Sequence, residues 1–156
     1  MTSTGFVRTP GRPESDGCLF TDLSVEEADA TVAVMKKHGL DTVFLAAPTS
    51  TERRLKLVAE YSTGFVYVVS RTGVTGEQAT VAGGVHDLVD RLKSLTSLPV
   101  AVGFGISRRE HVEAIGGYAD GVVVGSAFMR VVEEHGSSAS LAAQLESFTR
   151  GLSGRP

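Results

Sequence analysis

The chain has 156 residues, 42% hydrophobic and 21% charged, a balance typical of a globular protein with one domain-sized core. A net charge of −3 gives no general attraction to nucleic acid or anionic membranes, and no apolar run reaches the ~20 residues that a membrane span needs. The single cysteine excludes an intrachain disulfide and a thiolate metal cluster, and we expect a cytoplasmic protein.

The first 16 residues are polar and contain several glycines and prolines, so we expect an irregular N-terminal arm there. From residue 17 to residue 156, short β-branched runs alternate with amphipathic segments, which is typical of parallel βα units. The runs predict five strands, at 18–21, 42–46, 65–69, 100–102 and 121–124.

A helix is expected after each strand, and the last strand is followed by two. The expected ranges are 24–38, 51–61, 85–95, 108–116, 126–135 and 138–152. Ser24 with Glu27, and Ser107 with Glu110, have the spacing of a capping box at a helix start. Gly39 is expected to end the first helix.

This alternation predicts an α/β domain with a parallel sheet over residues 17–156. The strands show little alternation of polar and apolar residues, as expected where both faces of a parallel sheet are covered. Unit spacing fits a barrel and an open doubly wound sheet equally well, so periodicity leaves these two architectures open.

Glycine-containing loops follow three of the strands: Thr75-Gly76, Phe104-Gly105 and Gly125-Ser126. None has the spacing of a nucleotide-binding motif. Backbone amides beside a glycine, and at a helix that begins at Ser126, would suit a phosphate group. The alternative is that these glycines only form turns. The three loops together, with two helices after the last, favour phosphate binding.

Three segments resemble the signature segments of the tryptophan synthase alpha chain family. They are SRTGVTG (70–76), VGFGIS (102–107) and DGVVVGSA (120–127). Residues 16–28 and 44–49 are similar to the fourth and fifth strands of that family, and the likeness runs from about residue 16 to 150. It implies an α/β fold that is a partial (β/α)8 TIM barrel, with five parallel βα units and the first three units missing.

The family cleaves indole-3-glycerol phosphate to indole and glyceraldehyde 3-phosphate by a retro-aldol reaction, as part of tryptophan biosynthesis. The resemblance implies the same lyase chemistry on a small phosphate substrate. It implies the tryptophan synthase beta chain as partner, and pyridoxal phosphate only in that partner. No cofactor, metal, nucleic acid or membrane is expected for this chain.

The resemblance also implies site residues, each at the position that matches a family motif. Substrate phosphate would be held by the backbone of Gly76, Gly105, Gly125 and Ser126. The substrate pocket would be formed by Leu19, Tyr67, Thr75, Phe104 and Val123. Tyr67 would lie beside the indole, and Thr75 would steady a catalytic carboxylate. Arg71 would begin a loop, to about residue 83, that closes over substrate and touches the beta chain.

The catalytic carboxylates have no counterpart in this sequence. The reaction needs an acid for the indole ring carbon, a carboxylate near the indole nitrogen and a base for the glycerol hydroxyl. The family supplies these from a Glu on its second strand and an Asp in the following loop, both before the matched region. Glu14 and Asp16 lack a strand pattern around them, and Asp22 alone stands at a different barrel position. We therefore predict no catalytic residue here.

Three interpretations remain open. The chain is a lyase that works when a separate N-terminal part is supplied, or a non-catalytic phosphate-binding module that pairs with that part or with the beta chain, or its true start lies upstream. Five strands would leave two open edges, at 18–21 and 121–124, and an inner face lined by Leu19, Phe44 and Tyr67. We expect low stability alone, dimerisation through these edges, or dependence on a separately supplied N-terminal part.

Overall fold

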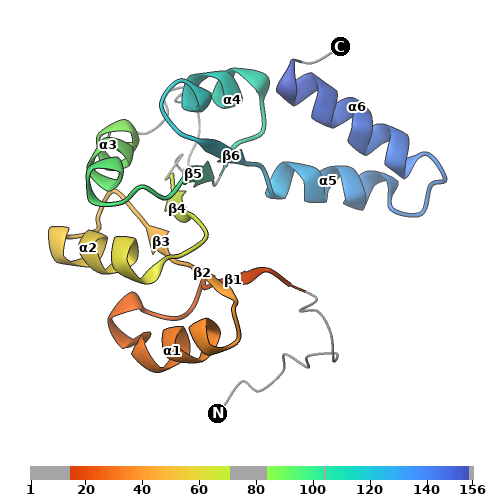
Figure 1. Ribbon diagram of the computed structural model, residues 1–156. Helices are drawn as coiled ribbons and strands as arrows, with labels where there is room; N and C mark the ends of the chain where they lie inside the picture. Colours follow the sequence, from red (N-terminus) through yellow and green to blue (C-terminus); the bar gives the residue numbers. More distant parts are fainter. Residues whose placement is uncertain (1–14, 71–83, 104, 155–156) are drawn as a thin grey trace.

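The computed structural model describes residues 15–70, 84–103 and 105–154. The expected irregular arm, apart from residues 15 and 16, and the loop expected from Arg71 to about residue 83 lie outside the described residues. Figure 1 shows the described units following one another around an arc.

The elements form successive βα units. The first contains β1 (Gly17–Leu19), the 3₁₀ helix η1 (Val25–Glu27) and α1 (Asp29–Lys37). The second contains β2 (Asp41–Val43), β3 (Leu45–Ala46) and α2 (Glu52–Tyr61). The third and fourth are β4 (Val66–Val69) with α3 (Val85–Leu95), and β5 (Val100–Gly103) with α4 (Arg109–Gly116). The last contains β6 (Gly121–Val123), α5 (Ser126–His135) and α6 (Leu141–Ser153).

The strands pair in chain order, and every pair is parallel. One sheet has the order β1-β2 and the other β3-β4-β5-β6. The predicted strand at 42–46 is divided at Phe44, because its first half pairs with β1 and its second half with β4. Such a stagger between neighbouring strands is a property of barrel sheets.

The strand order decides between the two architectures that periodicity left open. An open doubly wound sheet reverses its strand order at a switch point, and helices cover both of its faces. Here the order does not reverse, and helices α1 to α4 lie along the outer side of the arc in Figure 1. The described chain is therefore a partial TIM barrel of five consecutive βα units.

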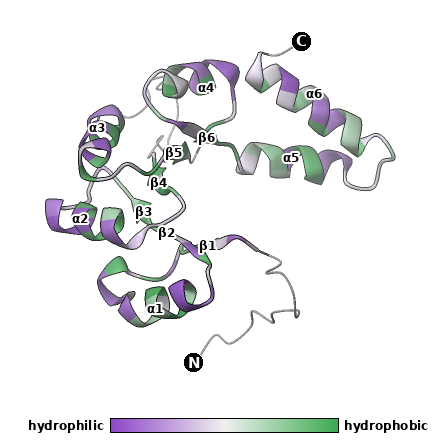
Figure 2. Cartoon of the chain, viewed as in Figure 1, coloured by the Kyte–Doolittle hydropathy of each residue, from purple (hydrophilic) through white to green (hydrophobic). Residues whose placement is uncertain are grey.

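The hydrophobic core lies between the strands and the outer helices. Ala46 pairs with Val68, and Val68 with Val102, so these buried side chains form one row on the convex face of the sheet. Fully buried side chains of α2 and α3, such as Leu55 and Leu88, pack against this face. In Figure 2, β4 and β5 are hydrophobic, whereas the outer helices carry hydrophilic and hydrophobic stretches in turn.

Phe44 belongs to this convex core, so the expectation that it lines the inner face is wrong. Its side chain is 1% exposed, stacks on the Phe20 ring at 5.3 Å between centroids and lies 6.4 Å from the ring of Tyr61. The cause is strand periodicity: Phe44 stands two residues before Ala46, which also faces the helices.

The two predicted capping boxes are also wrong. Ser24 precedes the short helix η1, and its hydroxyl donates to the Glu26 carboxylate and does not cap a helix. The α-helix begins four residues later than a Ser24 cap would place it, at Asp29. Arg108 occupies the N-cap position of α4 in place of Ser107. Both boxes failed because the helix starts later in the chain than the motif.

Gly39 ends α1 as predicted. Its φ of +64° lies in the left-handed region, which favours glycine. The N–H groups of Gly39 and Leu40 donate to the carbonyl oxygens of Lys36 and Met35, at 3.1 and 3.0 Å. These two bonds form a Schellman motif, which satisfies carbonyl groups at the helix end.

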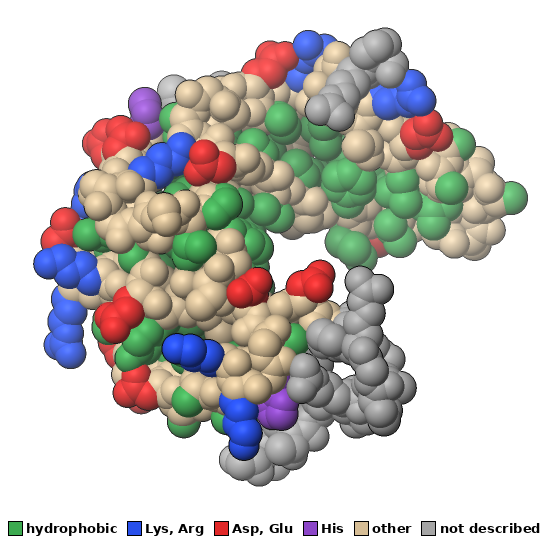
Figure 3. Space-filling model, in the orientation of Figure 1, with side chains coloured by type: hydrophobic (Ala, Val, Ile, Leu, Met, Phe, Trp, Pro, Cys, Tyr) green, Lys and Arg blue, Asp and Glu red, His purple; other side chains and the backbone are tan. Residues whose placement is uncertain are grey.

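The concave side of the arc is open. β1 and β6 are the end strands of the described sheets, so each is paired on one side only. Figure 3 shows the molecule hollowed on one side, with hydrophobic side chains gathered along the wall of the hollow over α5. Among the described helices none combines the length and hydrophobicity needed to cross a bilayer.

Candidate functional site

The carboxyl ends of β4, β5 and β6 lie side by side. Val69 pairs with Gly103, and Gly103 pairs with Val123. The segments that leave these three strands therefore start at one level of the sheet edge. Gly105 and Gly125 each stand two residues beyond that level, on the segments that leave the neighbouring strands β5 and β6. In parallel α/β folds this is the edge that carries ligand sites.

The start of α5 presents unfilled backbone donors at this edge. Gly125 is its N-cap residue, and α5 begins with the bond from Met129 N–H to the Gly125 carbonyl, 3.1 Å long. No side chain of the described chain caps this end. Ser126, the first helical residue, is exposed. The N–H groups of the first turn and the helix dipole together favour an anion.

Helix α5 differs from α1 to α4 in the acidic residues of its first turn. Each of α1 to α4 has an acidic residue in its first turn: Asp29, Glu52, Asp87 and Glu110. Such residues satisfy the positive end of a helix. Helix α5, as described, has none in its first turn. Its N-terminus is therefore electrostatically open to an external anion.

Gly105 contributes a backbone conformation that other residues rarely adopt. Its φ is +75°, and the residue is exposed at the carboxyl edge, next to the start of α4. A residue with a Cβ would be strained there. This position therefore depends on glycine for its conformation, and the backbone is accessible to a ligand.

The predicted pocket residues that the structure describes lie on the concave face. Leu19 is 37% exposed, and Tyr67 and Val123 are half-buried. Tyr67 pairs with Ala101, and Ala101 with Gly121, so these positions alternate with the buried valines of the convex face. The concave wall is thus apolar, as a pocket for an aromatic ring requires.

The side chain of Tyr67 reaches Gly103 of the neighbouring strand, two residues beyond its pairing partner Ala101. A Cβ added at Gly103 would stand 2.1 Å from the hydroxyl oxygen of Tyr67 and 2.6 Å from Cζ. Real Cβ atoms do not approach other atoms so closely, so the absence of a side chain at 103 makes room for the phenol. Burial raises the pKa of Tyr67 above its usual value of 10.0, so this hydroxyl stays protonated at neutral pH.

Ser70 is a residue of this edge whose contacts the sequence did not predict. It is fully buried, and both its backbone N–H and its hydroxyl donate to the Gly103 carbonyl oxygen, each at 2.9 Å. Ser70 follows β4 directly and begins the SRTGVTG motif. The only signal in the sequence was its place in that motif, since Gly103 lies 33 residues away.

Four predicted site residues, Arg71, Thr75, Gly76 and Phe104, lie outside the described residues. The others fall into two sets by their place in the fold. Gly105, Gly125 and Ser126 stand at the carboxyl edge, and Leu19, Tyr67 and Val123 line the concave face. Asp22, the carboxylate considered as a substitute acid, is exposed in the bend after β1.

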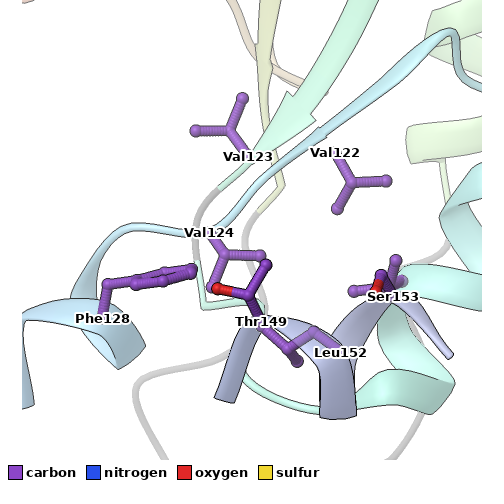
Figure 4. A pocket seen from close by; sticks show the side chains of 8 residues that line it. Val122, Val123, Val124, Phe128, Thr149, Leu152 and Ser153 are labelled. Atoms are coloured by element: carbon purple, nitrogen blue, oxygen red, sulfur yellow. The ribbon is translucent and has the colours of Figure 1, made fainter. Parts of the chain in front are cut away.

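An open apolar groove of about 390 Å³ borders β6 on the side of α4 and α6. Its lining, shown in Figure 4, consists of Val112, Val122, Val123, Val124, Phe128, Thr149, Leu152 and Ser153. Thr149 and Ser153 donate their hydroxyls to carbonyl oxygens of α6. The groove lining includes no ionisable side chain, so it supplies no acid or base.

The opposite edge of the sheet carries the clearest electrostatic interaction. Asp120 accepts a hydrogen bond from Val100 N–H at 2.9 Å and pairs with Lys93 at 3.0 Å. The Val100 bond, followed by the bond and charge of Lys93, lowers the pKa of Asp120 below its usual 3.8. This interaction holds the amino ends of β5 and β6 together, away from the candidate site.

No group of three or more His, Cys, Asp or Glu side chains within residues 15–70, 84–103 and 105–154 is arranged to hold a metal ion. His86 stacks on Tyr118 at 4.5 Å between ring centroids, and His111 contacts Arg108. These are packing contacts on the helix side. The candidate site therefore consists of backbone donors and an apolar wall.

Comparison with known proteins gives one consistent family. The family model described as "Tryptophan synthase alpha chain" matches residues 3–153. The chain is 63% identical to the tryptophan synthase alpha chain of Solibacter usitatus over 137 residues, which are 88% of this chain and 51% of that protein. It is 46% identical to the Methanocaldococcus jannaschii alpha chain, over 86% of this chain and 48% of that one.

Solved structures agree with the sequence relatives. A chain of the tryptophan synthase complex of Pyrococcus furiosus superposes with a TM-score of 0.79 at 39% identity, covering 89% of this chain and 56% of that one. A chain of tryptophan synthase from M. tuberculosis gives a TM-score of 0.71 at 36% identity, over 87% and 48%. This chain spans about half the length of the curated relatives it matches.

Proposed function

The chain belongs to the tryptophan synthase alpha chain family, and from this premise we propose that its domain at 17–156 supplies the phosphate-binding part of a lyase. The proposed substrate is indole-3-glycerol phosphate, which the retro-aldol reaction cleaves to indole and glyceraldehyde 3-phosphate. We place this activity in tryptophan biosynthesis in the cytoplasm. The proposed partner is a tryptophan synthase beta chain, which would hold the pyridoxal phosphate.

The observation that carries this proposal is the start of α5, at the same sheet edge as Gly105. Gly125 and Ser126 present backbone donors without a capping side chain from the described residues and without an acidic residue in the first turn. An anion at that point gains the helix dipole and hydrogen bonds that cost no rearrangement. Thr75 and Gly76 follow β4 in the sequence and lie outside the described residues, and we assign Gly76 to the same phosphate.

The apolar wall supports the other half of the assignment. The exposed Leu19 and the half-buried Tyr67 and Val123 present apolar surface on the concave face, as contact with an indole ring requires. Burial of that ring against such a wall is favourable by about 25 cal/mol per Å² of apolar surface removed from water. We assign Phe104 to the same wall and Thr75 to a catalytic carboxylate of the complete site.

In this proposal the chain binds and orients, and the proton transfers belong to carboxylates outside residues 17–154. Cleavage of the carbon–carbon bond needs a proton delivered to the indole ring carbon and another removed from a glycerol hydroxyl. Asp22 is a single exposed carboxylate in the bend after β1. One such group does not supply both transfers, so we assign it no catalytic role.

Two measurements test the proposal. Calorimetric titration of the chain with glycerol 3-phosphate should give saturable binding, and glycerol should give none. Addition of a fragment that comprises the N-terminal half of the Solibacter usitatus alpha chain should then release indole from indole-3-glycerol phosphate. The fragment alone and the chain alone are the controls.

A second candidate function is a non-catalytic phosphate-binding module that interacts with the beta chain. Asp22 favours it over a complete enzyme, since this one exposed carboxylate in the bend after β1 does not supply both proton transfers. Saturable phosphate binding without indole release in the mixture would support this module. Absence of phosphate binding would contradict both functions, because both depend on the α5 site.

A further inference from the structure

Gly103, Gly105 and Gly125 stand at the carboxyl edge together with the buried Ser70, and the glycines do not themselves make the backbone rigid. Gly103 and Gly105 lack side chains, so their own conformational preferences restrict the backbone very little. A backbone that binds an anion well is held in place before the ligand arrives. Some other group must therefore fix the end of β5.

Ser70 makes the contact that meets this need. Its N–H donates to the Gly103 carbonyl at 2.9 Å, which is the last ladder bond of the parallel pair Val69 and Gly103. Its hydroxyl donates to the same oxygen, also at 2.9 Å. An ordinary ladder carbonyl accepts one such bond, so the second donor further restricts the direction of this peptide group.

The Ser70 hydroxyl is also buried. Ser70 is 0% exposed, and a buried hydroxyl that lacked a partner would destabilise the fold. The Tyr67 side chain covers Gly103 at its α-carbon, as the short distances from an added Cβ show. Gly103 is thus contacted by the Tyr67 ring and by the two donors of Ser70. Tyr67 belongs to β4, and Ser70 is the first residue after that strand.

We propose that Ser70 is a positioning residue: by binding the Gly103 carbonyl with both donors, it fixes the backbone that leads to Gly105 and so preorganises the phosphate site. This role rests on the proposed function for its ligand. It differs from that function in assigning the rigidity of Gly105 to a residue that does not touch the phosphate.

The chain provides a matched control for the test. Ser62 is also a buried serine, 4% exposed, whose hydroxyl oxygen accepts a hydrogen bond from Phe44 N–H at 3.2 Å. It lies before β4, at the amino edge of the sheet. Ser62→Ala therefore removes a comparable buried side-chain bond to the backbone at the far edge, and Ser70→Ala removes the one at the site.

The first measurement uses the unliganded full chain and ¹⁵N relaxation. In Ser70→Ala the order parameter of the Gly105 amide should fall from the rigid range, about 0.85, toward about 0.6, and Ser62→Ala should leave it unchanged. Ser70→Cys, which replaces the hydroxyl by a somewhat larger and weaker thiol donor, should give an intermediate value. An unchanged Gly105 in Ser70→Ala overturns the inference, whatever the phosphate affinity.

The second measurement is the affinity for glycerol 3-phosphate. Loss of one hydrogen bond that preorganises the site should weaken binding by about threefold to tenfold in Ser70→Ala, and Ser62→Ala should bind as the wild type does. Equal weakening in both variants would show a general loss of stability and overturn the inference. If the wild type does not bind, the proposed function fails, while the relaxation result still decides whether Ser70 positions Gly105.

Discussion

The two edges of the parallel sheet are built in opposite ways. At the amino edge, side chains accept hydrogen bonds from backbone N–H groups. Asp120 accepts from Val100 N–H at 2.9 Å, and the Thr63 hydroxyl oxygen accepts from Thr42 N–H at 3.0 Å. At the carboxyl edge, Gly105 and Gly125 are exposed, and no described side chain caps α5.

This difference separates stability from ligand binding within one sheet. Groups at the amino edge already have partners, so a ligand there would have to break bonds. At the carboxyl edge the start of α5 has no capping side chain from the described residues, so a ligand there adds bonds. In TIM barrels generally, the carboxyl face carries the active site and the amino face contributes to stability. The comparison predicts that substitutions at one edge change mainly the stability, and at the other mainly the affinity.

The largest effect is expected for Gly125→Asp. No described heavy atom lies within 4 Å of an added Cβ, and the φ of −110° suits any residue, so the side chain is accommodated. The new carboxylate improves the N-terminus of α5 by about 0.3–1 kcal/mol but repels a phosphate there. We expect a higher Tm and a loss of more than about tenfold in affinity for glycerol 3-phosphate.

Gly125→Asn is the control for charge, because it has the same shape and also caps helices. Calorimetry and thermal unfolding of the two variants separate the effects. Equal phosphate affinity in the Asp and Asn variants would show that no anion binds at α5.

The second effect is expected for Gly103→Ala. The added methyl would lie 2.1 Å from the Tyr67 hydroxyl oxygen, so the phenol must move. Overpacking of this kind costs about 1–3 kcal/mol of unfolding free energy. Tyr67→Ala removes the clash, so the double variant should lose less stability than the two single losses together. Urea unfolding of all four proteins measures this coupling, and strict additivity would contradict the contact.

A third, smaller effect concerns α2, which starts at the same edge as α5 but is capped. The Thr51 hydroxyl oxygen accepts from Arg54 N–H at 3.3 Å. Thr51→Ala should lower the unfolding free energy by about 1 kcal/mol, and Thr51→Ser should restore it. Phosphate affinity should not change in either variant. A change in affinity would mean that the ligand site extends across the edge to α2.

The smallest effect is expected for Asp120→Asn at the amino edge. Its pKa is lowered by the Val100 bond and by Lys93, so the stabilisation is complete above about pH 4 and is lost as the pH falls through the folded-state pKa. Since the side chain is 43% exposed, the loss at pH 7 should be about 1 kcal/mol or less. Thermal unfolding should show the wild type and variant converging between pH 5 and about pH 2.

Much of the fold could be predicted from local patterns. Helix α3 has the predicted bounds, Val85–Leu95, because its apolar residues repeat at helical spacing and Gly84 stands before it. The alternation of strands and helices predicted the parallel units. Capping motifs were less reliable. Ser24 precedes a 3₁₀ helix where an α-helix was expected, and its hydroxyl donates to Glu26 and caps no helix.

The contacts of the site could not be predicted in the same way. Ser70 and Tyr67 meet Gly103 across a strand pair, and the register of that pair is set by the packing of whole strands. The division of the second strand at Phe44 depends on the stagger between its two neighbours. Sequence motifs indicated the candidate site residues, whereas the register of the strands determines which of these residues are in contact.

The strict chain order of the strands also bears on synthesis. β2 pairs with β1, and β4, β5 and β6 each pair with the strand that precedes them, while β3 continues the segment of β2. A ribosome adds about 5–20 residues per second, whereas pairing of nearby segments takes microseconds to milliseconds. Every new strand thus emerges after its partner is already available, and the polypeptide is able to assemble unit by unit while its later codons are still being read.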